Sequence, residues 1–345
     1  MNPLTVGKIR RFTSIRRGYY SLVLFTALLV LALFAELIIN KRALVVFYEG
    51  EWYFPIYGRM NPGTVFGLDY RYETDYRRLQ RKFRMERRGN FVLMPLVPYD
   101  AYEIEIREDA YPPYAPSLKR RHFLGTDVLG RDIVARLVYG FRICIAFSIF
   151  LLIANFAIGI SLGCLMGYIG GKFDLIFQRV IEIWSAIPFL YVIMIIASVI
   201  VPNLPILVLV SVLFGWMGLT WYMRTVSYRE RSRDYVMAAR ALGASNARIV
   251  FRHILPNSLS LVVTFVPFSV AGGISSLTAL DYLGFGLAAP TPSWGELLRQ
   301  SIENLQSIWI VSSIVSALVI VMVCVTFIGE AIREAFDPKL HTTFE

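Results

Sequence analysis

Long apolar segments separated by polar, charged loops dominate this sequence of 345 residues. Most are close to the roughly 20 residues that a helix needs to cross a lipid bilayer. The hydrophobic pattern predicts six membrane-spanning helices, at Tyr19–Ile39, Ile143–Ile169, Ile183–Val201, Leu204–Met223, Ser258–Leu280 and Ile308–Ile328. We therefore expect an all-α integral membrane protein with a polar insertion between its first two spans.

The first apolar segment could also be a signal peptide, because basic residues precede it. These are Lys8, Arg10, Arg11, Arg16 and Arg17. The apolar run is long for a signal peptide and no Ala-x-Ala cleavage site follows it, which favours an uncleaved anchor. Basic flanks stay on the cytoplasmic side, so we expect a cytoplasmic N-terminus, and six crossings return the C-terminus to the same side.

The composition, 56% hydrophobic with a mean hydropathy of +0.55, excludes an ordinary soluble domain. The net charge of +10 could suggest nucleic acid, but basic residues of membrane proteins usually face cytoplasm or anionic lipid. We therefore expect a lipid bilayer and no nucleic acid as partner. Cys144, Cys164 and Cys324 lie inside apolar runs and the histidines are far apart, so we expect no disulfide framework and no metal site.

The span pattern divides the chain into three parts. Residues 1–40 would form the cytoplasmic N-terminus and first helix, 41–121 an extracytoplasmic insertion domain, and 122–345 a five-helix membrane domain. The loop 224–256 of the last part is expected in the cytoplasm because arginines dominate it. They are Arg224, Arg229, Arg231, Arg233, Arg240, Arg248 and Arg252, against Glu230 and Asp234.

Two periodic patterns stand out in the insertion. Tyr72, Tyr76, Leu79 and Phe83 recur at helical spacing, with basic residues between them. Apolar and charged residues alternate over Tyr102–Ile106, which predicts a short strand with one buried face. The insertion would either brace the membrane domain or help to seat an external delivery protein.

Residues 234–256 predict a helical hairpin. Asp234 suits the N-cap of a first helix, and Gly243 suits its C-terminal end with a positive φ. Ser245 can cap a second helix, which Pro256 would end. Helical spacing places residues on two expected faces, Tyr235, Ala238, Ala239 and Leu242 in the first helix and Ile249, Val250, His253 and Ile254 in the second.

This hairpin resembles the EAA loop of ABC import permeases, which fits a cleft on the ATP-hydrolysing subunit. Met237 departs from the family pattern, because glutamate usually stands there. The resemblance implies a coupling site for separate ATPase subunits. Its residues would be Tyr235, Met237, Ala238, Ala239, Leu242, Gly243, Ile249, His253, Ile254 and Pro256.

The segment His122–Asp132, HFLGTDVLGRD, resembles the HPLGTDxLGRD segment of the oligopeptide/dipeptide branch of these permeases. Locally, Thr126 or Asp127 can cap a helix that starts near Val128. Asp132 and Arg136 would then form an ion pair on its surface. The residues by themselves predict an amphipathic helix at the membrane surface, without chemistry.

Further motifs follow in the family order over Phe123–Pro338. They are Gly170-Gly171, Leu283–Gly286, Pro290–Gly295 and Gly329–Pro338. Within this branch the chain resembles the Yej-type peptide permeases, through Gly50–Pro55, Leu213–Met217 and Leu280–Gly286. That resemblance implies uptake of peptides or peptide-like compounds such as microcin C.

The sequence carries no G-x-x-x-x-G-K-[ST] loop, no H-E-x-x-H and no G-x-S-x-G. It therefore assigns no catalytic, cofactor-binding or metal-binding residue to this chain. ATP and magnesium would be bound by partner ATPase subunits. The few acidic residues near the spans, Glu36, Glu182, Asp281 and Glu330, lie close to their ends, which disfavours a proton-coupled carrier.

The favoured hypothesis is a transmembrane subunit of an ABC peptide importer in the bacterial inner membrane. Its expected partners are a homologous permease, ATP-binding subunits and an extracytoplasmic peptide-binding protein. The alternative is a secondary transporter or channel that acts alone on an ion gradient. An intramembrane enzyme is a third class, for which the chain offers no nucleophile–base pair.

Overall fold

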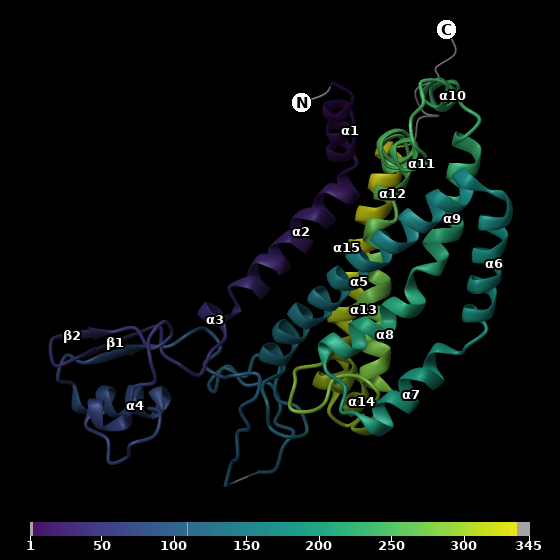
Figure 1. Ribbon diagram of the computed structural model, residues 1–345. Helices are drawn as coiled ribbons and strands as arrows, with labels where there is room; N and C mark the ends of the chain where they lie inside the picture. The colour runs from purple at the N-terminus through teal and green to yellow at the C-terminus, as the bar shows by residue number, and fades with distance from the viewer. Residues whose placement is uncertain (1–2, 109, 337–345) are drawn as a thin grey trace. The chain divides into compact units, whose positions relative to one another are not determined.

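The structure, a computed structural model, describes residues 3–108 and 110–336 (Figure 1). The described residues fall into two compact units. The first, the helical unit, takes in residues 3–25, 144–288 and 320–336. The second, the insertion unit, takes in residues 26–143 and 289–319. Within the described residues, helices are much more frequent than strands.

Five helical stretches of the described chain are long and apolar enough to cross a membrane. They are α2 (Arg16–Leu33), α5 (Ile133–Ile169), α8 with α9 (Leu204–Gly215 and Met217–Glu230), the end of α12 with α13 (Leu255–Val263 and Val266–Tyr282), and α15 (Ile308–Phe336). A sixth candidate is the bent pair α6 (Gly171–Ser185) and α7 (Phe189–Val199). The prediction of six spans agrees with this count when the bent pair is one span.

The bent pair corrects the sequence prediction of one straight span over Ile183–Val201. Helices α6 and α7 meet at 61°. Pro188 precedes α7, and proline lacks a backbone N–H and restricts the residue before it, so the helix cannot continue through this point. The Gly170-Gly171 motif forms the turn between α5 and α6, and both residues have positive φ.

The two ends of the helical unit contact each other. Gly18 of α2 lies so close to α15 that a Cβ atom there would collide with Ala331. Arg17 pairs with Glu330 at 3.4 Å. Three further short helices are α1 (Pro3–Ser14), α3 (Ala35–Ile38) and α14 (Trp294–Glu303). The last two residues of the predicted motif Gly329–Pro338 lie outside the described residues.

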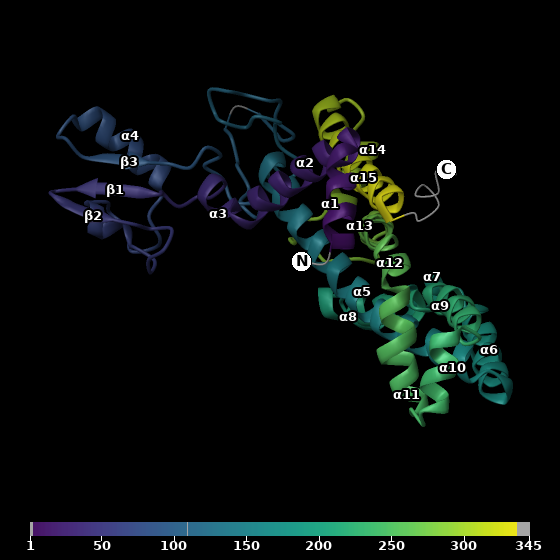
Figure 2. The ribbon, with the colours of Figure 1, turned by 90° about the horizontal axis from the view of Figure 1, so that it is seen from above.

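The insertion contains a small antiparallel sheet, which the sequence prediction missed. Its strands are β1 (Val45–Tyr48), β2 (Glu51–Tyr53) and β3 (Phe91–Leu93), in the order β2-β1-β3. Glu49 and Gly50 join β1 to β2 with positive φ at both positions, the geometry of a tight hairpin turn. Helix α4 (Tyr76–Glu86) lies along the sheet, as both ribbon views show (Figure 2).

The predicted helix in the insertion is confirmed from Tyr76 onward, whereas Tyr72 lies before it and is exposed. Asp75 caps α4, accepting from the backbone N–H groups of Arg77 and Arg78 at 3.0 Å each. The core between α4 and the sheet also includes the short 3-10 helix at Gly63–Phe66. Its buried residues are Ala43, Val46, Phe66, Tyr76, Leu79, Phe83, Val92 and Met94.

The predicted strand at Tyr102–Ile106 is wrong. This stretch has no strand pairing, and its apolar side chains are exposed. The alternation is real but inverted, because the glutamates point inward toward cations. Glu103 pairs with Arg77, and Glu105 contacts His122. A charged hydrogen bond to a partly buried cation outweighs the burial of one isoleucine here.

We predict that Phe83→Ala unfolds the insertion locally. The Phe83 ring is buried and stacks on Tyr48 with ring centroids 5.5 Å apart. Its removal should cost about 3–5 kcal/mol, the usual range for a buried phenylalanine. Trypsin should then cleave α4 much faster in the purified chain, whereas Met85→Ala, on the exposed side of α4, should cleave like wild type. Equal cleavage of both variants would contradict this core.

Candidate functional site

The predicted helical hairpin is present at one end of the helical unit (Figure 1). It consists of α10 (Asp234–Ala241) and α11 (Asn246–Ile249). Gly243 has φ of +78°, as predicted, and the N–H of Ala244 donates to Ala239 O at 3.1 Å, closing the end of α10. The predicted cap at Ser245 is also confirmed, since its hydroxyl accepts from the N–H of Arg248.

Two end signals of the hairpin were predicted wrongly. Helix α10 begins at Asp234 itself and Arg233 is the N-cap, so Asp234 is an acidic residue of the first turn. Pro256 does not end the second helix. A π-helical turn, Val250–Ile254, leads directly into α12, where Pro256 occupies the first turn and its missing N–H is tolerated.

The first predicted face of the hairpin is divided between the interior and the surface. Val236, which the prediction omitted, and Ala239 are buried, and Ala239 is only 7% exposed. Met237 is 52% exposed and Leu242 is 89% exposed. Ala239, which the family resemblance assigned to the coupling site, therefore faces the interior, where its small side chain lets α10 approach the rest of the unit.

The second predicted face turns inward as well. Ile249, Val250 and Ile254 are buried in one cluster with Cys164 of α5 and Met223 of α9. His253 is half-buried, and Pro256 is exposed. Of the first face, Tyr235 is half-buried and donates to Glu230 at 3.0 Å, while Ala238 is exposed. Met237 and Ala238 of α10 and Leu242, its C-cap, are thus exposed residues of the predicted site.

Helices α5 and α9 hold the hairpin from below through close backbone contact. Gly163 lets the two helices approach, because a Cβ there would lie 2.8 Å from Met223 Cβ. Ser227 of α9 donates to Cys164 O at 2.7 Å. Arg240 of α10 donates to Tyr168 Oη at 3.2 Å. Because the hairpin is attached to α5 and α9 through these contacts, a displacement of the hairpin would also displace these two helices.

A second constellation lies at the other end of α5, where the sequence predicted a surface helix. That prediction is wrong, because α5 begins at Ile133 and the preceding residues form a buried charge network. Arg131 and Arg136 are among the largest fully buried side chains. Arg131 donates to Asp127 at 2.6 Å and to Glu296 of α14 at 2.7 Å.

Arg136 completes this network. It pairs with Glu296 and not with Asp132 as predicted. It also donates to three backbone carbonyls, those of Ala101 at 3.2 Å, Pro290 at 3.3 Å and Thr291 at 3.2 Å. Sequence reasoning missed Glu296, although Ser293 three residues earlier is a capping-box signal for α14, and Ser293 Oγ does accept from the N–H of Glu296.

His122 links the network to the insertion. Its Nδ1 contacts Asp132 at 2.7 Å, its Nε2 contacts Glu105, and its ring stacks on Tyr99 at 3.9 Å. Burial alone would lower the pKa of His122, but the bonds to the two carboxylates raise it. Burial alone would raise the pKa of Glu105, but hydrogen bonds from His122 and Arg107 lower it to about 2.

No three histidine, cysteine, aspartate or glutamate side chains of the described residues are arranged to hold a metal ion. The hairpin and the network hold their positions through helix contacts and ion pairs formed by the chain itself.

Comparison with known proteins identifies the family. Residues 159–342 match the family described as binding-protein-dependent transport system inner membrane component. The inner membrane ABC transporter permease protein YejE of Escherichia coli is 41% identical over 98% of both chains. The peptidoglycan transport system permease protein YejE of Agrobacterium fabrum is 37% identical, over 98% of this chain and 94% of that one.

The oligopeptide transport system permease protein OppC of Haemophilus influenzae is 32% identical over 65% of this chain and 73% of its own length. This chain belongs to the binding-protein-dependent transport family. The resemblance to Yej-type ABC permeases is confirmed, and the match of full length includes the insertion.

The permease is thus a multi-pass subunit of an inner-membrane transport system. The hairpin, at residues 234–249, lies inside the part that matches the family, whereas the insertion and the His122–Asp132 segment precede it. The insertion is shared with the Yej-type relatives, whose alignments extend over nearly the whole chain.

The His122–Glu105 contact predicts a pH-dependent stability. Glu105 stabilises the fold above its unfolded pKa, about 4.3, and this contribution is lost as pH falls toward 2. His122 stabilises it fully below its unfolded pKa, about 6.5, and this contribution is lost as pH rises through the higher native pKa. His122→Gln should therefore cost roughly 2 kcal/mol near pH 6 and much less at alkaline pH.

Thermal unfolding of the permease in detergent, between about pH 5 and pH 9, measures this difference. Wild type and His122→Gln should converge as pH rises. Parallel curves would show that the imidazole charge does not stabilise the fold.

Proposed function

We propose that this chain is the transmembrane permease subunit of an ATP-binding-cassette importer that moves peptides or peptide-like compounds into the cytoplasm. The observation that carries the proposal is the identity of 41% to an ABC transporter permease over 98% of both chains. Relatives named for peptidoglycan, oligopeptide and dipeptide transport support the substrate class, because all of these molecules contain amino acids joined by amide bonds.

Separate ATPase subunits would supply the energy through the hairpin. Met237 and Leu242 expose apolar surface at the outward side of α10, and a partner surface is the usual reason for such exposure beside a rigid core. Met237 stands where related permeases usually carry glutamate, so docking here rests more on apolar contact than on charge. Movement of the ATPases would then shift α5 and α9 between two packed arrangements.

A homologous permease would enclose the transport pathway together with this chain, and an extracytoplasmic binding protein would deliver the peptide. The described contacts support a common side for both ends of the helical unit. Arg17 near the start of α2 pairs with Glu330 near the end of α15, which supports an even number of crossings between these two positions. The basic N-terminus and the arginine-rich hairpin support a cytoplasmic location for this side.

We predict that Leu242→Asp weakens the permease–ATPase complex. The side chain is 89% exposed, so the hairpin should fold normally, while a charge in an apolar contact should reduce binding roughly tenfold. Co-purification of the ATPase in detergent and uptake of a labelled tripeptide would both fall. A large residue at Ala239 would not test docking, because Ala239 lies in the hairpin core and Ala239→Trp would disrupt the hairpin itself.

Leu118→Asp is the matched control, an equal change at a leucine that is 81% exposed in the insertion. It should leave ATPase recovery unchanged. If Leu242→Asp also left both recovery and uptake unchanged, the outward side of α10 would not be the coupling surface.

The proposed topology predicts opposite accessibility of two engineered cysteines. Ser117→Cys in the insertion should react with a membrane-impermeant maleimide in intact spheroplasts, and Ser232→Cys before the hairpin should react only after permeabilisation. Both are made in a background in which the native cysteines, all buried, are replaced. Thr342, a further cytoplasmic position by this topology, lies outside the described residues. Labelling of both positions from one side would refute an N-in, C-in arrangement.

A further inference from the structure

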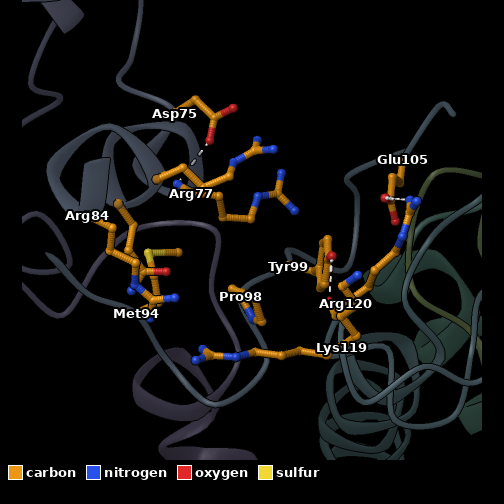
Figure 3. A pocket seen from close by; sticks show the side chains of 12 residues that line it. Asp75, Arg77, Arg84, Met94, Pro98, Tyr99, Glu105, Lys119 and Arg120 are labelled. Atoms are coloured by element: carbon orange, nitrogen blue, oxygen red, sulfur yellow. Dashed lines mark hydrogen bonds and ion pairs between the residues drawn. The ribbon is translucent and has the colours of Figure 1, made fainter. Parts of the chain in front are cut away.

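A basic pocket of about 620 Å³ lies in the insertion unit and is lined by none of the hairpin residues (Figure 3). One wall comes from α4, where Arg77, Arg81 and Arg84 lie on one helical stripe. Lys119, Arg120 and Arg121 also line the pocket. Figure 3 shows Arg77 and Arg84 on the α4 side and Tyr99, Lys119 and Arg120 on the other side of the hollow.

The two carboxylates that line the pocket are already engaged. Asp75 caps α4 by accepting from two backbone N–H groups. Glu105 contacts His122 and accepts from Arg107 at 3.2 Å and Arg120 at 3.3 Å. Both carboxylates therefore already have hydrogen-bond partners within the chain.

The six cations that line the pocket differ in their hydrogen-bond and ion-pair partners. Arg77 pairs with Glu103 and stacks on Tyr99 at 4.5 Å, and Arg121 donates to Pro95 O at 3.1 Å. Arg81, Arg84 and Lys119 have no ion pair among the described contacts. Like charges three or four residues apart on a helix repel, so this stripe destabilises α4 unless an anion screens it.

We propose that this pocket binds a phosphate-bearing anion through Arg81, Arg84 and Lys119. Guanidinium groups match the geometry of phosphate oxygens, and a lysine adds a mobile point charge. The volume is typical of a small-ligand site and far larger than one acidic side chain, which favours a small molecule or a head group over a protein loop. Tyr99, Pro98 and Met94 offer apolar surface to the rest of the ligand.

Two sources supply this chemistry, a soluble phosphate compound and a phospholipid head group. The site goes beyond the proposed transport function, because it uses no hairpin residue and requires no ATPase. Loss of anion binding would leave the peptide transport proposal intact, and loss of hairpin coupling would leave this site intact.

The test measures both sources with the purified full-length chain. Inorganic pyrophosphate binding is followed by isothermal titration calorimetry in neutral detergent. Lipid binding is followed as cardiolipin retained after exchange into phosphatidylcholine nanodiscs, by native mass spectrometry. The pocket variant Arg81→Gln/Arg84→Gln should weaken one of these interactions by roughly tenfold or more, since it removes two charge-assisted contacts.

The matched control is Arg78→Gln/Arg88→Gln, which removes equal charge from exposed positions that do not line the pocket. It should bind like wild type. Pyrophosphate binding lost only in the pocket variant establishes a soluble ligand, and cardiolipin retention lost only there establishes a head group. Absence of both interactions in wild type, or equal loss in the two variants, overturns the proposal.

Discussion

Two buried arginines, Arg131 and Arg136, constrain the start of α5. Removing a charge from water costs several kcal/mol, and only a well-placed carboxylate recovers it. Glu296 supplies that carboxylate to both arginines from a position 165 and 160 residues further along the chain. The segment before α5 and the start of α14 must therefore meet. The side chain of Arg136 also donates to the backbone carbonyls of Pro290 and Thr291, in the irregular stretch before α14.

The same helix that begins at this network ends in the core of the hairpin. Helix α5 has 37 residues, which at 1.5 Å each gives a length of about 55 Å. Its last turns pack against α9 through Gly163 and Gly167, where a side chain would collide with the α9 backbone. The hairpin therefore sits on a rigid support. A stiff support is what a transport subunit needs if events at an ATPase are to move its spans.

Charge is handled in two opposite ways along the chain. At Arg131 and Arg136 the cations are buried and each has a carboxylate partner. On α4 the cations Arg81 and Arg84 line a pocket without ion-pair partners among the described residues. Paired charge fixes the internal structure, whereas unpaired charge at a concave surface is available to a ligand. His122 contacts Asp132, the neighbour of Arg131, and Glu105 accepts from Arg120, which lines the pocket.

The sequence by itself determined the helical membrane architecture, because apolar runs of span length have few other stable structures in lipid. It also determined the hairpin's turn at Gly243, its cap at Ser245 and helix α4, all of which depend on neighbouring residues. Tertiary structure alone decided which sides face inward. Ala239 is buried because α5 and α9 leave room for a methyl group. Glu105 points inward because its carboxylate contacts the buried imidazole of His122. Such contacts join residues far apart in sequence, so local periodicity cannot report them.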